Sequence, residues 1–432
     1  MNTSPPPVLS PTALSFDPAA IAAAHGTPTW VYDAATIETR IAELAAFDAV
    51  RYAQKANSNL AVLALMRKHG VKVDAVTAGE LHRAKLAGYE LGSDDVVYTA
   101  DLFDDDALAM IREHAIPVNV GSPDMIGQLA DPPDGGPRID VPITLRINPG
   151  FGHGHSQKVN TGGESSKHGI WHTQVADCLA AAKQHGLTVR GLHMHIGSGA
   201  DFEHLSQVAG AMVDAARTFA EHADTLSVIS AGGGLPIPYR KDQPDRIDLG
   251  RYHRVWDEAR QSIAELTGND IHLEVEPGRY LVAEAGSLVA EVRSVKQTGQ
   301  NRYLVLDTGF NDLVRPAFYG AYHHLSVHRP DGELPDETED VIVAGPLCES
   351  CDVFTQDEDG TVTTRRLPRA EPGDLVVMHD AGAYGMAMSS NYNSRRIAAE
   401  VLLIDGKAHV VRERQPIESL TQFESIPDTF AD

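Results

Sequence analysis

The 432-residue sequence has only three cysteines, and its acidic side chains outnumber its basic ones by 60 to 36. Three cysteines do not build a disulfide framework, so the fold must be held by its own packed core. The formal net charge of -24 repels phosphate groups at long range and argues against nucleic acid and anionic membrane surfaces as partners. Small solutes are the better candidates.

The chain also lacks a long apolar run. No stretch approaches the roughly 20 apolar residues that a membrane helix needs. The N-terminus, MNTSPPPVLSPTALSF, lacks the basic start and apolar core of a signal peptide. These absences predict a protein of the reducing cytoplasm, with no membrane partner. Its length allows two domains with substantial buried cores.

What the sequence does contain is a regular alternation of short β-branched runs with helical stretches rich in alanine and leucine. Eight such runs are VRYAQ, VKVDAV, DVVYT, IPVNV, VPITLRI, TVRGLHMHI, LSVIS and IHLEVE, which begin at residues 50, 71, 95, 116, 141, 188, 226 and 271. Strands that alternate with helices indicate a parallel sheet, and eight such units are what a closed (β/α)8 barrel requires. An open doubly wound sheet fits the same periodicity, because periodicity does not show closure.

After about residue 285 the helical spacers thin out and the strand-like runs follow one another closely. They read SLVAEV, RYLVLD, DVIVAGP, DLVVMHD, EVLLI and AHVVRER. This change predicts a β-rich domain over residues 286–432, after a barrel over residues 46–285. The early run PTWVYD is expected to pair into the same β-rich sheet, so residues 1–45 are assigned to a segment that packs with it.

Several polar residues and glycines fall where the predicted barrel strands end, which is where the chemistry of such a barrel collects. Each residue alone has an ordinary interpretation, because a strand-end lysine is usually solvated and a lone histidine is usually structural. Their coincidence on one predicted rim favours a functional site. The set comprises Lys55, Asp74, Arg146, His195, Gly232, Gly233, Gly234 and Glu276.

The chemistry of these residues suits one cofactor. A lysine beside a desolvating wall forms a Schiff base with a carbonyl group, and glycine N–H groups let a phosphate approach closely. A carboxylate such as Glu276 keeps a pyridine nitrogen protonated, and His195 can lie flat over such a ring. Pyridoxal phosphate needs this combination from its protein.

Seven motifs resemble those of the diaminopimelate decarboxylases, which belong to the fold-type III group of pyridoxal phosphate enzymes. They span about residue 28 to about residue 415 and read YAQKANSN, HMHIGSG, SAGGGLPIPY, EPGRY, FNDLVRPAFYGAYHH, AGPLCESCDVF and GAYGMAMSSNYNSR. The resemblance implies an alanine racemase-like (β/α)8 barrel of the TIM type with a second β-rich domain. It also implies a homodimer with shared active sites that converts meso-2,6-diaminopimelate to L-lysine and carbon dioxide, the last step of lysine biosynthesis.

The resemblance assigns roles to individual residues. Lys55 is the Schiff-base lysine, His195 stacks on the cofactor ring, and Cys348 is the proton donor. The implied cofactor-binding residues are Lys55, Asp74, His195, Ser198, Gly233, Gly234, Glu276, Pro277, Gly278, Arg279 and Tyr384. The implied substrate-binding residues are Arg279, Arg315, Tyr319, Glu349 and Tyr384. One subunit contributes Cys348 and Glu349 to the site of its neighbour.

Two arginines support this substrate on chemical grounds. Diaminopimelate differs from lysine by one carboxylate, so an enzyme that acts on it and spares lysine should hold that distal end with cations. Guanidinium groups such as Arg279 and Arg315 bind carboxylates through paired hydrogen bonds. Either arginine alone is more readily explained as an ion pair at a surface or a domain interface, but both adjoin motifs of the site.

Two other functions fit parts of the sequence. The same fold and cofactor can serve ornithine, arginine or lysine, but a cationic distal group calls for an acidic pocket rather than paired arginines. A non-catalytic carrier of pyridoxal phosphate needs neither Cys348 nor the substrate arginines.

No metal site is expected from the histidine-rich and cysteine-rich stretches. The glycine-rich segment NPGFGHGHSQKVNTGGESSKHGIWH lacks nearby cysteine or carboxylate pairs and is interpreted as a flexible loop over the barrel mouth. Its histidines are His153, His155, His168 and His172. The spacing of Cys348 and Cys351 in CESC is interpreted as a coincidence, because no second pair completes a zinc site.

Overall fold

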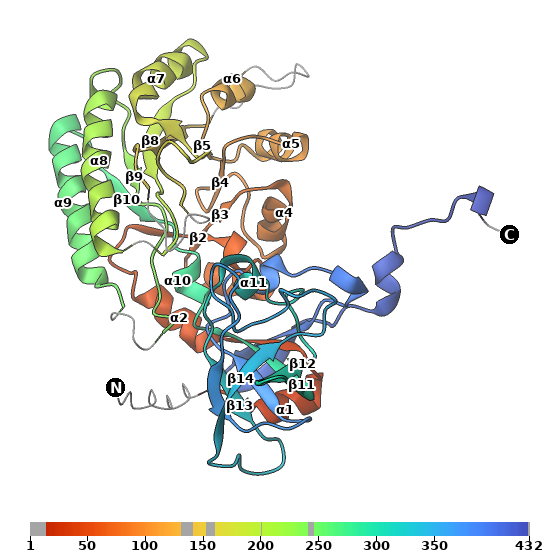
Figure 1. Cartoon of the computed structure of the whole chain (residues 1–432). Coiled ribbons are helices and arrows are strands. Elements are labelled where there is room, and N and C mark those ends of the chain that lie inside the picture. Colours follow the sequence, from red (N-terminus) through yellow and green to blue (C-terminus); the bar gives the residue numbers. More distant parts are fainter. Residues whose placement is uncertain (1–13, 131–140, 153–159, 200, 241–245, 431–432) are drawn as a thin grey trace. The chain divides into compact units, whose positions relative to one another are not determined.

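The computed structural model describes residues 14–130, 141–152, 160–199, 201–240 and 246–430 (Figure 1). The chain forms two compact units. One unit comprises Ala35–Glu284, and the other joins the residues up to Ala34 with those from Ala285 onward. None of the helices within the described ranges has the length and apolar character needed to cross a membrane.

The unit over residues 35–284 is a closed barrel of parallel strands. The strand order is β5-β4-β3-β2-β10-β9-β8-β6, and β5 also pairs with β6, which closes the barrel. This pairing confirms the predicted (β/α)8 barrel and excludes the open sheet. The strands are β2 (Ala49–Ala53), β3 (Lys72–Ala75), β4 (Val96–Ala100), β5 (Val118–Val120), β6 (Ile143–Asn148), β8 (Val189–Met194), β9 (Val228–Ser230) and β10 (His272–Val275), with a short β7 (Ile170–Trp171) beside β6.

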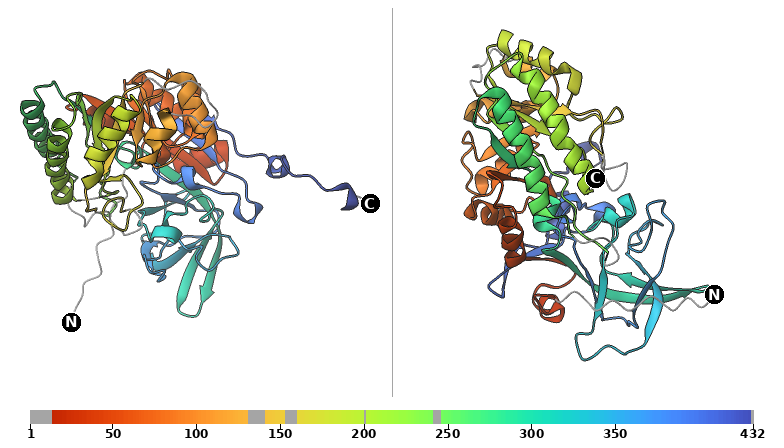
Figure 2. Two further views of the ribbon diagram at one scale, coloured as in Figure 1. Left: turned by 90° about the horizontal axis from the view of Figure 1, so that it is seen from above. Right: turned by 90° about the vertical axis from the view of Figure 1, so that its left-hand side faces the viewer.

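Helices connect these strands around the outside of the barrel, and Figure 2 shows the two longest, α8 and α9, side by side. Five of them begin at a polar cap, because the side chains of Asn59, Thr77, Asp104, Asp201 and Asp248 each accept a hydrogen bond from the first helical turn. The helices are α2 (Ala34–Ala42), α3 (Leu60–Lys68), α4 (Ala78–Leu86), α5 (Asp105–His114), α6 (Asp124–Ala130), α7 (Val175–Gln184), α8 (Phe202–Ala220) and α9 (Leu249–Thr267).

Residues 35–45 group with the barrel, whereas the sequence analysis assigns them to the segment that packs with the β-rich domain. The reason lies in their contacts. Nε of Arg40 in α2 lies 3.0 Å from Oε2 of Glu284, and the hydroxyl of Tyr280 donates to Glu43 at 2.6 Å. Leu44 is fully buried. These contacts attach α2 to the last turn of the barrel unit.

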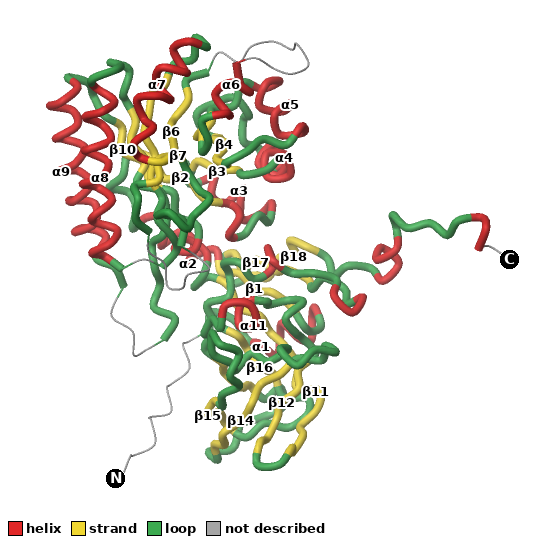
Figure 3. Tube along the Cα trace, turned by 45° about the horizontal axis from the view of Figure 1, so that its top comes forward, coloured by secondary structure: helices red, strands yellow, loops and turns green. Residues whose placement is uncertain are grey.

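The other unit is built on a mixed sheet with the order β15-β14-β12-β11-β1-β17-β18, and β16 pairs with β11 and β13 (Figure 3). β1 lies between β11, to which it is antiparallel, and β17, to which it is parallel. This confirms that PTWVYD joins the β-rich sheet. The strands are β1 (Thr29–Asp33), β11 (Gly286–Thr298), β12 (Asn301–Leu306), β13 (Leu325–His328), β14 (Thr338–Ala344), β15 (Arg365–Pro368), β16 (Leu375–Met378), β17 (Ala399–Ile404) and β18 (Lys407–Arg412).

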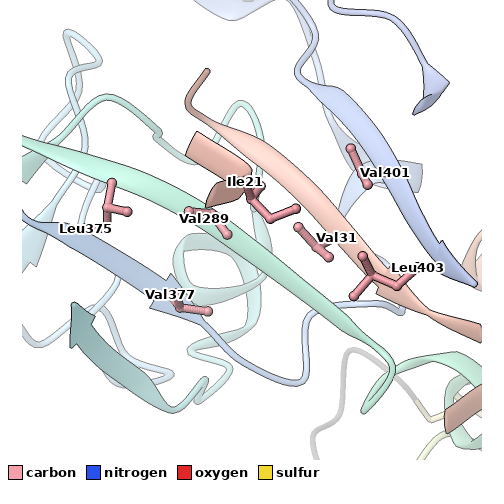
Figure 4. Close-up of a cluster of buried hydrophobic side chains, with 7 residues drawn as sticks. All are labelled: Ile21, Val31, Val289, Leu375, Val377, Val401 and Leu403. Atoms are coloured by element: carbon pink, nitrogen blue, oxygen red, sulfur yellow. The ribbon is translucent and has the colours of Figure 1, made fainter. Parts of the chain in front are cut away.

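An apolar cluster holds the N-terminal residues onto this sheet (Figure 4). Ile21, from α1 (Pro18–His25), packs with Val31 of β1 and with residues of three later strands. In the register of the sheet Val31 lies beside Val401, and Val289 lies beside Val377. The full cluster is Ile21, Val31, Val289, Leu375, Val377, Val401 and Leu403. Burying these side chains makes the first described strand an internal part of the second unit.

Candidate active site

The carboxyl ends of the barrel strands bring together the predicted residues of the barrel unit. Lys55 lies in a 3-10 turn directly after β2, Asp74 lies near the end of β3, and His195 directly follows β8. The glycines 232–234 follow β9, and the turn 276–279 follows β10. Because the strands are parallel, these ends all meet at one rim of the barrel.

Lys55 is an exposed residue within a buried segment. Gln54 and Ala56, its two neighbours, are both buried, as are the four residues before Lys55. The positive charge of Lys55 acts on Asp74, Glu80 and His195. The turn after β2 therefore presents one amine at the rim, within electrostatic reach of two acids and an imidazole.

Two buried carboxyl groups at this rim have opposite pKa shifts. Burial raises the pKa of Asp74, and the negative charge of Glu276 raises it further. Burial also opposes the ionisation of Glu276, but the charge and hydrogen bond of His193, with a hydrogen bond from Ser230, outweigh it and lower the pKa of Glu276. At neutral pH the negative charge therefore sits on Glu276, and Asp74 is biased toward its neutral form.

Glu276 is held by residues of two neighbouring strands. Oγ of Ser230, at the end of β9, donates to Oε1 of Glu276 at 3.0 Å. Nε2 of His193, on β8, lies 2.6 Å from Oε2. The backbone N–H of Glu276 donates to the carbonyl oxygen of Gly232 at 2.8 Å. Both side-chain oxygens and the backbone are thus fixed.

His195 is held as a neutral ring. The backbone N–H of Gly233 donates to Nδ1 of His195 at 3.2 Å, so Nδ1 is an acceptor and the ring proton is on Nε2. Burial lowers the pKa of His195 well below its ordinary value, and the positive charges of Lys55 and Arg146 lower it further. A neutral, oriented imidazole suits a residue expected to lie against the face of an aromatic ring.

The glycine turn is packed so closely that side chains are excluded from it. A Cβ atom at Gly233 would lie 2.4 Å from the carbonyl oxygen of Glu276, and one at Gly234, where φ is +100°, would lie 2.4 Å from that of Gly197. Two of the N–H groups expected to face a phosphate are instead engaged within the protein. That of Gly232 donates to Oγ of Ser230, and that of Gly233 donates to His195. The turn thus orients site residues as well as shaping the rim.

Arg279 begins the short helix α10 (Arg279–Val282) and is only 5% exposed. Its Nη2 donates to Oγ of Ser198 at 3.0 Å, and its Nη1 donates to the hydroxyl of Tyr239 at 2.7 Å. A buried guanidinium that donates to two hydroxyl groups has a fixed orientation. Arg279 and Ser198, both predicted site residues, are therefore in direct contact.

Pro277 and Gly278 form the turn before Arg279. The carbonyl oxygen of Pro277 accepts a hydrogen bond from the N–H of Ala53 at 3.2 Å. A Cβ atom at Gly278 would lie 3.2 Å from the carbonyl oxygen of Ala53, so a side chain there would press on the end of β2. These two residues therefore join the turn after β10 to the strand that leads to Lys55.

Five predicted residues belong to the β-rich unit, and Arg315 is the most buried of them. It begins α11 (Arg315–Tyr319) and is 2% exposed, while Tyr319 at the other end is half-buried. Nη1 of Arg315 lies 2.8 Å from Nε2 of His323, and Nδ1 of His323 lies 2.9 Å from the carbonyl oxygen of His379. A carbonyl oxygen only accepts, so Nδ1 carries the ring proton and Nε2 accepts from the guanidinium.

Cys348 and Glu349 lie on an exposed loop after β14. The N–H of Cys348 donates to Oδ1 of Asn393 at 2.9 Å, and the hydroxyl of Tyr392 donates to the carboxylate of Glu349. Cys348 and Cys351 are both free thiols. Cys348 and Glu349 are therefore exposed, and their loop is held by hydrogen bonds to Tyr392 and Asn393.

Tyr384, which the sequence analysis assigns to both cofactor and substrate, lies in a tight turn between β16 and β17. Its φ of 58° falls in the left-handed region, which residues other than glycine rarely adopt. A Cβ atom at the following Gly385 would lie 2.4 Å from Cη2 of Trp30. The backbone of this turn is thus constrained, and the tyrosine side chain is half-buried.

The structure also shows partners that the sequence analysis missed. They are His193 and Ser230 at Glu276, Tyr239 at Arg279, His323 at Arg315, and Tyr392 and Asn393 at the cysteine loop. One of them had a local signal. His193 and His195 are two residues apart at the end of a predicted strand, and side chains two apart in a strand point to the same face.

The glycine-rich loop contributes hydrogen bonds to the barrel unit. Nδ1 of His168 lies 2.5 Å from Oδ2 of Asp101, and the N–H of Gly169 donates to Oδ1 of Asp101 at 2.9 Å. His153 and His155 lie outside the described residues. Across the ranges that the structure describes, no three histidine, cysteine, aspartate or glutamate side chains gather as a metal site.

Known proteins match nearly the whole chain. Residues 35–283 match the family model described as the pyridoxal binding domain of pyridoxal-dependent decarboxylases. A diaminopimelate decarboxylase of Escherichia coli (strain K12) is 52% identical over 406 residues, which cover 93% of this chain and 94% of that protein.

Solved structures agree with these sequence matches. A crystal structure of diaminopimelate decarboxylase has a TM-score of 0.88 at 51% identity and covers 93% of this chain and 94% of its own. One from Helicobacter pylori, complexed with L-lysine, has a TM-score of 0.83 at 30% identity and covers 94% and 98%. The barrel, its rim of site residues and these likenesses lead to one conclusion. The chain belongs to the diaminopimelate decarboxylase family of pyridoxal-dependent decarboxylases.

Proposed function

We propose that this chain catalyses the pyridoxal phosphate-dependent decarboxylation of meso-2,6-diaminopimelate to L-lysine and carbon dioxide, the last step of lysine biosynthesis, in the cytoplasm. The observation that carries the proposal is that an exposed lysine, Lys55, and a buried carboxyl group of lowered pKa, Glu276, lie on the same barrel rim. The likeness to diaminopimelate decarboxylases over more than nine-tenths of the chain supports it.

The residues of the barrel rim fit pyridoxal phosphate. Lys55 offers an amine, Glu276 offers a negative charge for a protonated ring nitrogen, and the glycine turn leaves no side chain in the way. Oδ1 of Asp74 is buried and has no hydrogen-bond partner among the described residues, which is unusual for a polar atom unless a ligand completes it. When bound, the cofactor supplies an electron sink for the electron pair left by the departing carbon dioxide.

Individual residues of the chain would bind, orient and move protons. Lys55 would hold the cofactor through Nζ, Glu276 would keep a proton on the ring nitrogen, and the neutral ring of His195 would pack on the cofactor face. Asp74, Ser198 and the turns Gly233–Gly234 and Glu276–Arg279 would complete its binding, together with Tyr384. Sγ of Cys348 would return a proton to the α carbon of the product.

The substrate would be held by Arg279, Arg315, Tyr319, Glu349 and Tyr384. The two arginines would bind the distal carboxylate, the group that lysine lacks. Arg279 and Arg315 are both almost fully buried, so each charge lies in a desolvated environment where it discriminates strongly between a carboxylate and no charge. A Helicobacter pylori relative complexed with L-lysine supports lysine as the product.

The assembly we propose is a homodimer with shared active sites. A thiol that protonates the product should be shielded from bulk water, because water would compete as the proton source. In the single chain Cys348 and Glu349 are exposed. A second subunit that receives these two residues into its own site would provide the missing shield.

The substrate is tested by measuring carbon dioxide release from a panel of amino acids with the holoenzyme. We expect release from meso-diaminopimelate and only background release from L-lysine, L-ornithine and L-arginine. Preferred turnover of ornithine, arginine or lysine would instead support the related decarboxylase function. Cofactor binding without release from any substrate would identify a carrier.

Replacing Arg315 with methionine should lower kcat/KM for meso-diaminopimelate by roughly one to two powers of ten, because a hydrogen bond to a charged group contributes about 1.5 to 3 kcal/mol. Steady-state kinetics measure the effect, and thermal melting checks that the fold is intact. Arg366→Met is the matched control, since Arg366 is an exposed arginine of β15 whose pairing with Asp340 is a surface contact. Unchanged kcat/KM in Arg315→Met would mean that another group binds the distal carboxylate.

A further inference from the structure

His193 is a buried histidine to which the roles proposed above assign no contact with cofactor or substrate. It lies on β8 and is 1% exposed. Its neighbour across the sheet is Ser230, because the register of β8 and β9 places the two residues side by side. Both side chains reach Glu276, His193 at Oε2 and Ser230 at Oε1. Three adjacent strands therefore converge on one carboxylate.

The hydrogen bond defines where the histidine carries a proton. A carboxylate accepts hydrogen bonds, so Nε2 of His193 must be the donor to Glu276. The other ring nitrogen, Nδ1, is buried and has no hydrogen-bond partner among the described residues. A buried polar atom without a partner lowers stability. Among the described residues, the polar contact of the His193 side chain that offsets this cost is the hydrogen bond from Nε2 to Glu276.

A comparison with the neighbouring acid Glu274 shows why the hydrogen bond from His193 to Glu276 is important. Glu274, the other acid of β10, is occupied by Arg51, with Nε to Oε2 and Nη2 to Oε1 both at 2.7 Å. Among the described residues no arginine forms a hydrogen bond with Glu276, whose side-chain partners are His193 and Ser230. The negative charge of Glu276 also raises the pKa of the nearby Asp74. The charged or titratable groups that face this cluster from the surrounding elements are Arg51, Lys55, Asp74, Glu80, Arg146, His195 and Glu274.

We propose that His193 is a positioning residue that keeps Glu276 ionised and aimed at the cofactor ring nitrogen. The proposal rests on the proposed function only in that Glu276 faces that nitrogen. Nε2–H of His193 stabilises the charged form of the carboxylate, and Ser230 fixes its other oxygen. Each oxygen keeps a second lone pair, so Glu276 can accept from the ring N–H without losing either partner.

The test compares His193→Leu with His193→Gln in the full-length protein. Leucine removes the donor, whereas glutamine offers an N–H at a similar reach. Titration of the apo proteins with pyridoxal phosphate, followed by absorbance, should show affinity about 10- to 100-fold weaker for His193→Leu and close to wild type for His193→Gln. Because loss of a donor raises the pKa of Glu276, the acid limb of both the cofactor absorbance titration and the kcat profile should move to higher pH in His193→Leu.

Ser230→Ala removes the other hydrogen bond with a smaller change in volume and should shift the same titration in the same direction. Wild-type affinity and an unmoved acid limb in both His193→Leu and Ser230→Ala would overturn the proposal. So would equal losses in the leucine and glutamine variants, since a role in packing alone predicts no rescue by a donor. The cofactor titration uses no amino acid, so failure to decarboxylate diaminopimelate would count against the proposed function and leave this proposal intact.

Discussion

Lys55→Ala protein is expected to purify without covalently held cofactor and to lose turnover by at least about 10³-fold, a loss within the range for removal of one positioned catalytic group. The physical reason is that Lys55 is an exposed amine in a buried turn, beside the buried acids of the rim. Alanine keeps the local 3-10 geometry and removes only the amine. The measurements are the absorbance of the purified protein and carbon dioxide release from meso-diaminopimelate.

Lys68→Ala is the matched control for this experiment. Lys68 is an exposed lysine at the end of α3, and because α3 returns toward the start of β3 it lies away from the catalytic rim. This variant should keep the colour and the rate of the wild type. Borohydride reduction and peptide mapping of the wild type should find the cofactor on Lys55. Normal turnover of the Lys55→Ala protein would show that Lys55 is not the Schiff-base lysine.

Mixing two inactive proteins should restore activity if the active site is shared. Lys55→Ala chains keep Cys348, and Cys348→Ala chains keep Lys55, so a mixed dimer assembles one site with both groups intact. Random exchange makes half of the dimers mixed, each with one of two sites rebuilt, so about one quarter of the wild-type specific activity should return. Each variant alone should stay near background, so the activity of the mixture should be many times that of either variant alone.

The control for subunit exchange is the double variant Lys55→Ala/Cys348→Ala. Mixed with either single variant it can rebuild no complete site, so its mixtures should stay inactive. Differently tagged chains, recovered together after mixing, verify that exchange took place. Verified mixed dimers without activity would show that Lys55 and Cys348 act within one chain.

Much of this architecture can be predicted from the sequence because the strands are short and strongly β-branched. All eight predicted barrel strands are present, and β1 joins the sheet expected for PTWVYD. Closure could not be predicted, since it depends on the pairing of β5 with β6 rather than on any local pattern. The unit boundary lies between Ala34 and Ala35, not near residue 45, and it could not be predicted for a similar reason. Arg40 and Glu284 are 244 residues apart, and no local signal links them.

For the candidate site, too, local sequence features could be predicted, whereas contacts that depend on the fold could not. Lys55 and Glu276 stand out because a charged residue at the end of an apolar strand is unusual. The glycines stand out because a residue without a side chain lets a ligand approach the backbone. The direction of the glycine N–H groups could not be predicted, because it depends on where Ser230 and His195 come to lie. Tyr392 reaches Glu349 across 43 residues of sequence, which periodicity does not reveal. His193 was within reach of prediction through its alternation with His195.

The position of β1 between β11 and β17 has a consequence for the order in which this protein forms. During synthesis β1 emerges before the whole barrel, but its two neighbours come from residues 286–298 and 399–404. Until the ribosome has made β17, one edge of β1 has no partner, and an open strand edge is a template for wrong pairing. The sheet of the β-rich unit is thus completed late in synthesis, because the barrel sequence is inserted between β1 and its partner strands. Its contacts of high sequence separation are the slow kind to form.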